Sequence, residues 1–188
     1  YAENKYFNKP SGLMDQMACS VGGFISIDFK DTANPEISKI DFDFGATGHS
    51  LCIVDTKGDH ANLTDEYAAV RKEMEAVAAV FGKKVLREVD ENEFYSSIAK
   101  VRAAAGDRAV LRATHFYNEN RRVDELKNAL QSGDFEKFKS VITESGHSSY
   151  MFNQNVYAPK QPNVQSVSVA LSICERVLKG KGAWRVHG

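Results

Sequence analysis

A change in the spacing of apolar residues, close to residue 60, constrains the fold of this chain more than any other feature of its sequence. Before it, apolar residues alternate with polar ones over 25–29 and 40–44, and the turn-forming stretch 31–35 separates the two. This pattern predicts a hairpin, and the mostly apolar run 50–55 predicts a buried strand. After it, apolar residues recur every three or four positions, which predicts helices. Strands followed by helices favour an α+β fold over a doubly wound sheet.

Glycines and capping residues predict where the helices end. We expect helices over 11–21, 64–81, 90–105, 107–132, 135–146 and 164–178. In the first, Ser11 is the expected N-cap and Gly22-Gly23 the stop, and Asp90 with Glu93 forms a capping pair for the third. The polar stretch 148–162 predicts a loop, and 183–186 predicts a short final strand.

Composition excludes several classes of protein. The chain has 188 residues, 43% of them hydrophobic, with 24 Lys and Arg against 25 Asp and Glu. A net charge of −1 lacks the basic excess of a nucleic-acid-binding protein. No apolar run approaches the length of a membrane span, and no signal peptide opens the sequence. Three widely separated cysteines fit a reducing compartment, so we expect a cytoplasmic protein without a membrane partner.

Asp15 is the first candidate for a functional side chain. With Ser11 as N-cap, Asp15 lies one turn into its helix, beside the small residues Gly12, Ala18 and Cys19. A carboxylate in such surroundings leaves room for a ligand hydroxyl. From spacing alone, however, a solvated Asp near a helix start is the favoured interpretation.

Tyr67 begins the apolar stripe of its helix, which favours a place in the core, although a buried hydroxyl would need a partner and a ligand could supply it. Asp55, Asp59 and His60 match no metal-ligand spacing, so a polar loop is preferred and no metal site is expected. Salt bridges and caps explain the cations on the later helices. These are His115, Arg121, Arg122 and His147.

One run is more specific than any single spacing. Lys-Pro-Ser-Gly-Leu-Met-Asp-Gln-Met at 9–17, followed by Val-Gly-Gly at 21–23, resembles the central segment of galactokinases, members of the GHMP kinase superfamily. Three further stretches agree in order: Thr-Asp-Glu-Tyr at 64–67, the helix around 115–123, and Arg-Val-His-Gly at 185–188.

The resemblance implies a fold and a division of the chain. Residues 1–48 would be the end of the N-terminal GHMP kinase domain, with the catalytic-Asp helix and its strands. Residues 49–188 would be a truncated C-terminal domain, ferredoxin-like with added helices. Matched position by position, Asp15 would be the catalytic aspartate, Gly12 a backbone contact to the sugar, and Tyr67 a side-chain contact to it.

The activity implied is transfer of the γ-phosphoryl group of ATP, with Mg²⁺, to the anomeric hydroxyl of galactose, giving galactose 1-phosphate. Gly188 matches only the first edge of the family's closing glycine motif, a nucleotide contact. The family's phosphate loop should lie before Tyr1, so we expect a fragment that is inactive alone and without useful ATP affinity. The loss of the N-terminal half should also expose apolar surface and favour self-association.

Two alternatives stay open. Pro-Asn-Val-Gln at 162–165 replaces the family's more frequent Pro-Glu-Leu-Asp, which leaves room for a kinase acting on N-acetylgalactosamine or a galacturonate. A non-catalytic, sugar-sensing member of the family is the other alternative, because small changes in the phosphate loop abolish turnover and spare binding.

Overall fold

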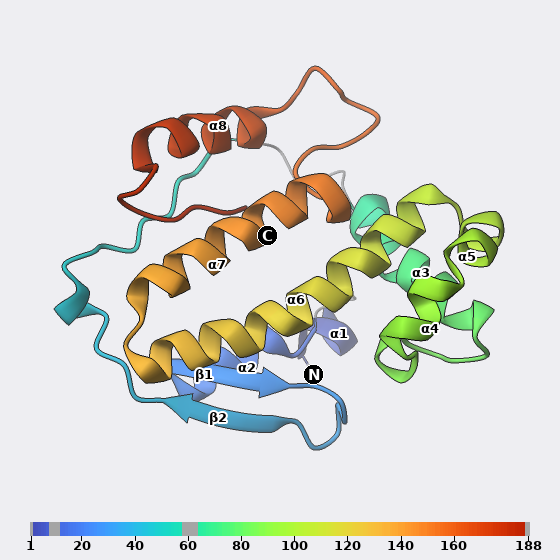
Figure 1. Ribbon diagram of the computed structural model, residues 1–188, viewed down its shortest axis with the longest axis horizontal. Coiled ribbons are helices and arrows are strands. Elements are labelled where there is room, and N and C mark those ends of the chain that lie inside the picture. The colour runs from blue at the N-terminus through green and yellow to red at the C-terminus, as the bar shows by residue number, and fades with distance from the viewer. Residues whose placement is uncertain (1, 8–11, 58–63, 187–188) are drawn as a thin grey trace. The chain divides into compact units, whose positions relative to one another are not determined.

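The computed structural model describes residues 2–7, 12–57 and 64–186, and the chain divides into two units, Tyr1–Asp43 and Phe44–Gly188. Each unit is described by itself. The described residues are rich in helix and contain one two-stranded sheet, which is compatible with the expected α+β class (Figure 1).

The first unit contains the predicted hairpin. Its elements are α1 (Ala2–Tyr6), α2 (Met14–Val21), β1 (Phe24–Asp28) and β2 (Glu36–Ile40). The strands are antiparallel, with Phe24 opposite Ile40 and Asp28 opposite Glu36. The second strand therefore lies at Glu36–Ile40 and shares only Ile40 with the predicted 40–44. Phe42 instead packs edge-on against Phe24, with ring centroids 5.5 Å apart.

Helix α2 begins later than its sequence predicts. The N-cap is Leu13, with no side-chain cap bond, so Ser11 is not the N-cap; Ser11 itself lies outside the described residues. A start at Ser11 would place Gly12 inside the helix, where glycine is unfavourable. The predicted stop is confirmed, because Gly22 and Gly23 have φ of +69° and +70°.

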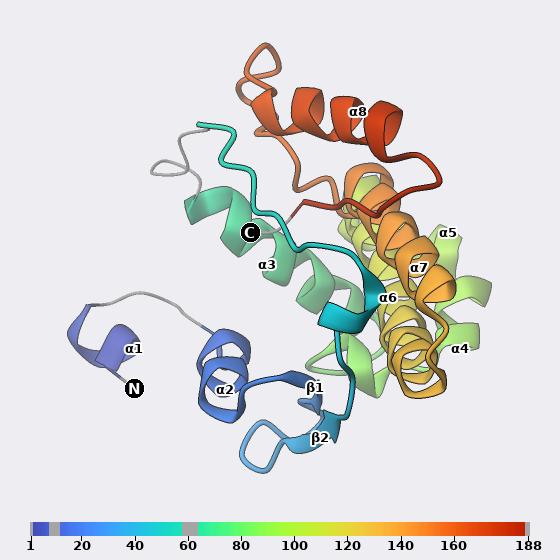
Figure 2. The same cartoon turned by 90° about the vertical axis from the view of Figure 1, so that its left-hand side faces the viewer.

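The second unit is helical. Its elements are η1 (Gly45–Thr47), α3 (Thr64–Val80), η2 (Leu86–Glu88), α4 (Glu91–Ser96), α5 (Ile98–Ala105), α6 (Asp107–Ser132), α7 (Phe135–Ser148), the π-helix η3 (Ser149–Asn153) and α8 (Ser166–Leu178). Helices α6 and α7 lie side by side in both ribbon views (Figures 1 and 2). The Asp90 cap is confirmed, since its carboxylate accepts from the Glu93 N–H at 3.0 Å. Gly106 and Gly133 bound α6 as predicted, with φ of +88° and +72°.

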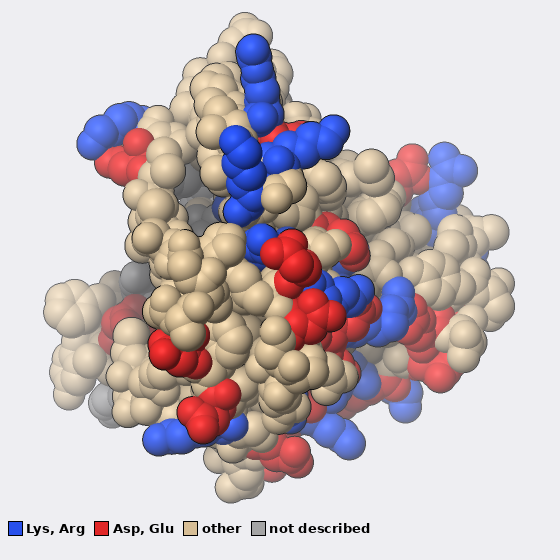
Figure 3. Space-filling view, turned by 60° about the vertical axis from the view of Figure 1, so that its left-hand side comes forward, with Lys and Arg blue, Asp and Glu red and all other residues tan. Residues whose placement is uncertain are grey.

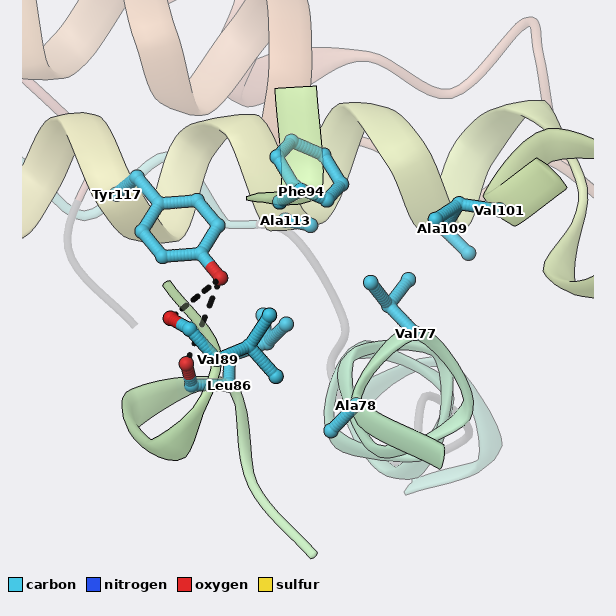
Figure 4. Close-up of a cluster of buried hydrophobic side chains, with 9 residues drawn as sticks. All are labelled: Val77, Ala78, Leu86, Val89, Phe94, Val101, Ala109, Ala113 and Tyr117. Atoms are coloured by element: carbon cyan, nitrogen blue, oxygen red, sulfur yellow. Dashed lines mark hydrogen bonds between the residues drawn. The ribbon is translucent and has the colours of Figure 1, made fainter. Parts of the chain in front are cut away.

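A buried cluster joins α3 to α6 and to the segments between them (Figure 4). Small residues on α6 let α3 approach closely, and Phe94 fills the space between. The Tyr117 hydroxyl points at the carbonyls of Leu86 and Val89, at 3.5 and 3.3 Å. The cluster comprises Val77, Ala78, Leu86, Val89, Phe94, Val101, Ala109, Ala113 and Tyr117.

The two strands expected in this unit are not formed. Residues 51–57 and 182–186 have no regular structure, and the side chains of Leu51 and Ile53 are 85% and 92% exposed. A strand needs a neighbour for its backbone groups, and no other strand lies in the described part of this unit. The apolar composition of 50–55 is that of a strand, but the predicted strands at 50–55 and 183–186 are wrong, because neither segment pairs with another strand in the described part of this unit.

Gly146 does not end α7. The helix continues to Ser148 and then widens into η3, so the predicted loop begins only after Asn153. A Cβ at position 146 would lie 2.8 Å from the Trp184 carbonyl oxygen and 3.2 Å from Arg185. Glycine is needed there for the close passage of the returning chain rather than for a helix stop.

Candidate functional site

Asp15 is the second residue of α2, exposed to solvent. The positive end of the helix stabilises a carboxylate at this place. No hydrogen bond or ion pair joins Asp15 to another described residue. A Cβ at Gly12 would meet no atom of the residues that the structure describes within 4 Å. The carboxylate is therefore available to accept a hydrogen bond from a ligand hydroxyl.

The support beneath this helix is thinner than the sequence predicts. Met17 and Val21 are half-buried, but the apolar side chains of Leu13 and Met14 are exposed. Ala18, expected on the open side with Asp15, is half-buried.

Tyr67 lies in the first turn of α3, and its side chain is 52% exposed. Burial increases along its stripe, from half-buried Val70 and Met74 to fully buried Val77. The core position that periodicity favours for Tyr67 is therefore wrong, because the packed part of the stripe begins one turn later. No described residue is hydrogen-bonded to its hydroxyl. This exposure leaves the hydroxyl accessible to a ligand.

An ionic cluster holds α3 against α6. Glu73 accepts hydrogen bonds from Arg108 at 2.6 and 2.9 Å and from Arg112 at 2.8 Å. Glu66, next to Tyr67 in sequence, lies 3.9 Å from Arg108. The hydrogen bond to Glu73 raises the pKa of Arg108, whereas burial lowers the pKa of Arg112, which is only 1% exposed.

The cluster continues into η3. Arg112 Nε donates to the Asn153 carbonyl at 3.0 Å, and Asn153 Oδ1 is buried without a partner among the described residues. Sequence reasoning missed this cluster, although one signal was present. Two acidic residues at helical spacing lie on α3, Glu66 and Glu73, and two basic residues at helical spacing lie on α6, Arg108 and Arg112.

Of the four other basic residues singled out on the later helices, the two arginines form the salt bridges that the sequence predicts, whereas the two histidines contact a serine and a tryptophan. His115 Nδ1 lies 2.9 Å from Ser148 Oγ, and burial, foremost, lowers the pKa of this histidine. Glu119 accepts from Arg122 at 2.6 Å and from Ser145 at 2.7 Å. Arg121 pairs with Glu91, and the His147 ring lies edge-on to Trp184.

No group of metal-ligating side chains occurs in 2–7, 12–57 or 64–186. Asp59 and His60 lie outside the described residues, and Asp55 pairs with Lys57 at 2.7 Å. A groove of about 530 Å³ between η2 and α6, lined in part by Arg87 and Tyr117, does not include Tyr67. Nor is any described helix both long and apolar enough to cross a membrane.

The structure brings Gly12 and Asp15 together within the first unit. Gly12 and Asp15 lie at the start of one helix in the first unit, and Tyr67 lies at the start of another in the second. Gly188 lies outside the described residues. The candidate residues therefore lie at two exposed helix starts, each described within its own unit.

Comparison with known proteins shows which family of enzymes this chain resembles along its length. No protein-family model matches the chain. It is 31% identical over 183 residues to a galactokinase of Streptomyces lividans, covering 96% of the chain and 45% of that relative. A galactokinase of Mannheimia succiniciproducens is 27% identical over 187 residues, and one of Streptomyces coelicolor is 29% identical over 184. The chain thus spans less than half the length of these curated relatives, and along nearly all of its own length it is similar to galactokinases.

Proposed function

We propose that this chain is part of a galactokinase, an enzyme that transfers the γ-phosphoryl group of ATP to the anomeric hydroxyl of galactose. The observation that carries the proposal is the similarity to galactokinases over 96% of the chain at 31% identity. The finer assignment, a GHMP kinase fold with 1–48 in one domain and 49–188 in the other, belongs to the same proposal.

Asp15 would act on the sugar hydroxyl. A proton acceptor must lie within hydrogen-bond reach of the proton that it takes, with no competing partner. The exposed carboxylate of Asp15, to which no described residue is hydrogen-bonded, meets the second requirement. Phosphoryl transfer depends largely on positioning, so Asp15 would orient the hydroxyl as well as attract its proton.

Tyr67 would bind the sugar through its exposed hydroxyl. A single neutral hydrogen bond contributes about 1 kcal/mol, so this role would appear in the apparent KM more than in kcat. The Glu73 cluster would keep the first turn of α3 in place through Glu66 and Arg108.

ATP and Mg²⁺ fit the described residues poorly. The described residues contain no cluster that could hold a metal ion, and Gly188 alone does not make a nucleotide site. We therefore assign no step through ATP or Mg²⁺ to residues of this chain, and we propose that other parts of the complete enzyme bind them.

A kinase for a related sugar is the second candidate. Pro162–Gln165 precedes α8, and the Gln165 side-chain amide donates to the Pro162 carbonyl at 2.7 Å, which fixes a turn different in sequence from the family pattern. Turnover of galactose, N-acetylgalactosamine and galacturonate by the full-length protein separates the substrates, and binding without turnover would indicate a sugar sensor.

The test is Asp15→Asn in the full-length protein, compared with Asp124→Asn. Asp124 is an exposed helical aspartate on α6, so it matches the chemical change away from the site. We expect Asp15→Asn to lower kcat at least about a hundredfold and to leave galactose binding nearly unchanged. Equal turnover by the two variants would remove Asp15 from the mechanism.

A further inference from the structure

One histidine contacts three separate parts of the second unit. His49 follows η1, and its Nδ1 lies 2.8 Å from the Thr47 carbonyl oxygen. At the other edge of the ring, Nε2 lies 3.2 Å from the carbonyl oxygen of Lys181, which follows α8. The same Nε2 lies 3.4 Å from Nζ of Lys139 on α7, and the ring packs against Phe135 with centroids 4.9 Å apart. These contacts hold the imidazole in one orientation.

The partners of the ring determine which nitrogen carries a proton. A carbonyl oxygen only accepts hydrogen bonds, so Nδ1 of His49 donates to Thr47. In the neutral ring, Nε2 then has a lone pair, which accepts from the Lys139 ammonium and cannot bond to the Lys181 carbonyl. In the protonated ring, Nε2 donates to the Lys181 carbonyl, and the positive charge repels Lys139. Protonation therefore exchanges one partner of Nε2 for the other.

We propose that His49 is a pH-sensitive latch between η1 and the segment 179–186 that follows α8. Histidine is the side chain whose ordinary charge change falls between about pH 5 and 8. In acid, the ring donates at both nitrogens and ties Lys181 to Thr47. At higher pH, it accepts from Lys139 and releases the Lys181 carbonyl. The inference concerns this device alone and does not rest on the proposed kinase activity.

The charges around the latch keep Lys139 close to His49. The Lys139 ammonium pairs with Glu136 at 2.7 Å and lies 5.7 Å from the centre of the Phe135 ring, and its side chain is only 11% exposed. The field of the whole chain favours neither state, because the net charge is −1 and acidic and basic side chains lie side by side over the face drawn in Figure 3. The local partners of His49 therefore decide which state forms.

The latch acts on the middle of the segment 179–186. The beginning of this segment is tied to α8, since the Lys181 N–H donates to the Leu178 carbonyl at 2.8 Å. Its far end passes close to α7, where the Trp184 carbonyl oxygen lies at Gly146. The bond from His49 to the Lys181 carbonyl joins the stretch between these two points to η1. Release of this bond should let that stretch open locally while the helices stay folded.

Nitrogen-15 NMR of the imidazole tests the protonation pattern. At about pH 8 we expect His49 to be neutral and protonated at Nδ1, and at about pH 5 to be protonated at both nitrogens. The His49 signals are identified by their loss in His49→Gln. A neutral His49 that is protonated at Nε2 would overturn the proposal, because its Nδ1 would then be unable to donate to Thr47.

Acrylamide quenching of the single tryptophan, Trp184, tests the release of the segment. The His147 ring lies edge-on to Trp184, so His147→Gln is present in every sample and removes the titration of that neighbour. We expect quenching to be at least about twofold stronger at about pH 8 than at about pH 5, because a hydrogen bond from a charged donor holds Lys181 only in the acid state.

Two further substitutions show whether His49 causes this difference. Adding His49→Gln should remove it, whereas adding His115→Gln, the same change at a buried histidine of α6, should leave it in place. Quenching that does not depend on pH, a difference that persists in His49→Gln, or its equal loss in both variants would refute the latch.

Discussion

Glu73 offers the sharpest test of how the helical unit is held together, because one carboxylate serves two arginines. We consider Glu73→Gln, which keeps the shape and removes the charge. The Arg112 guanidinium is almost fully buried and would keep only its bond to the Asn153 carbonyl and one to the new amide oxygen. Arg108 is part-exposed and can turn toward solvent or Glu66.

The magnitude follows from these two environments. Breaking a fully buried ion pair from one side costs about 3–5 kcal/mol, whereas an exposed pair contributes about 0–1 kcal/mol. Because Arg112 retains part of its hydrogen bonding and Glu73 is partly exposed, we expect a loss of about 2–3 kcal/mol in the free energy of unfolding. Urea unfolding at pH 7 measures it, with the slope against denaturant unchanged.

Glu75→Gln is the control for the same helix. Glu75 pairs with Arg71 across an exposed surface, so its loss should cost less than about 0.5 kcal/mol. Adding Arg112→Met to Glu73→Gln should recover stability, because an apolar side chain no longer needs a buried partner. A Glu73→Gln variant as stable as Glu75→Gln would show that the cluster does not hold α3 to α6.

Three further predictions concern the same unit. Burial raises the pKa of Tyr117 to about 12, so the phenol ionises at lower pH in the unfolded chain than in the folded one. The free energy of unfolding should therefore fall by about 2–3 kcal/mol between about pH 10 and 12. Urea unfolding at alkaline pH measures this loss, which Tyr117→Phe should remove. Burial lowers the pKa of His115, so the contribution of the neutral side chain to the free energy of unfolding is present above the ordinary pKa near 6.5 and is lost as pH falls below it. In the same measurement, His115→Gln should reduce the loss of stability at acid pH. Gly146→Ala should cost about 1–3 kcal/mol, because the new Cβ displaces the backbone at Trp184 and Arg185, and the single tryptophan reports the shift by fluorescence.

Capping residues and turn glycines correctly predicted the elements whose ends depend on neighbouring residues in the sequence. Helix α6 runs from Asp107 to Ser132 as expected, because Gly106 with positive φ ends α5 just before it and Gly133 with positive φ ends α6 itself. The hairpin, though not the position of its second strand, and the Asp90 cap are also confirmed, and each depends on residues only a few positions apart.

Several predictions failed because their outcome depends on distant residues. The run 50–55 has a strand's composition, but a strand also needs a neighbour, which the run itself cannot specify. Gly146 satisfies the rule for a helix stop, yet the Trp184 backbone determines its role from 38 positions further along the chain. The Glu73 cluster was missed for the same reason, because helical charges become buried only when two helices meet.

Asp15 and Tyr67, unlike the core residues, were not identified as site residues by the spacing of the sequence. Their types and positions were identified by resemblance, whereas spacing alone favoured a solvated Asp and a buried Tyr. The exposure of both side chains means that neither contributes much packing to its unit. Asp15→Asn and Tyr67→Phe should therefore leave the free energy of unfolding within about 0.5 kcal/mol of the parent, so a loss of activity in either variant would reflect chemistry rather than folding.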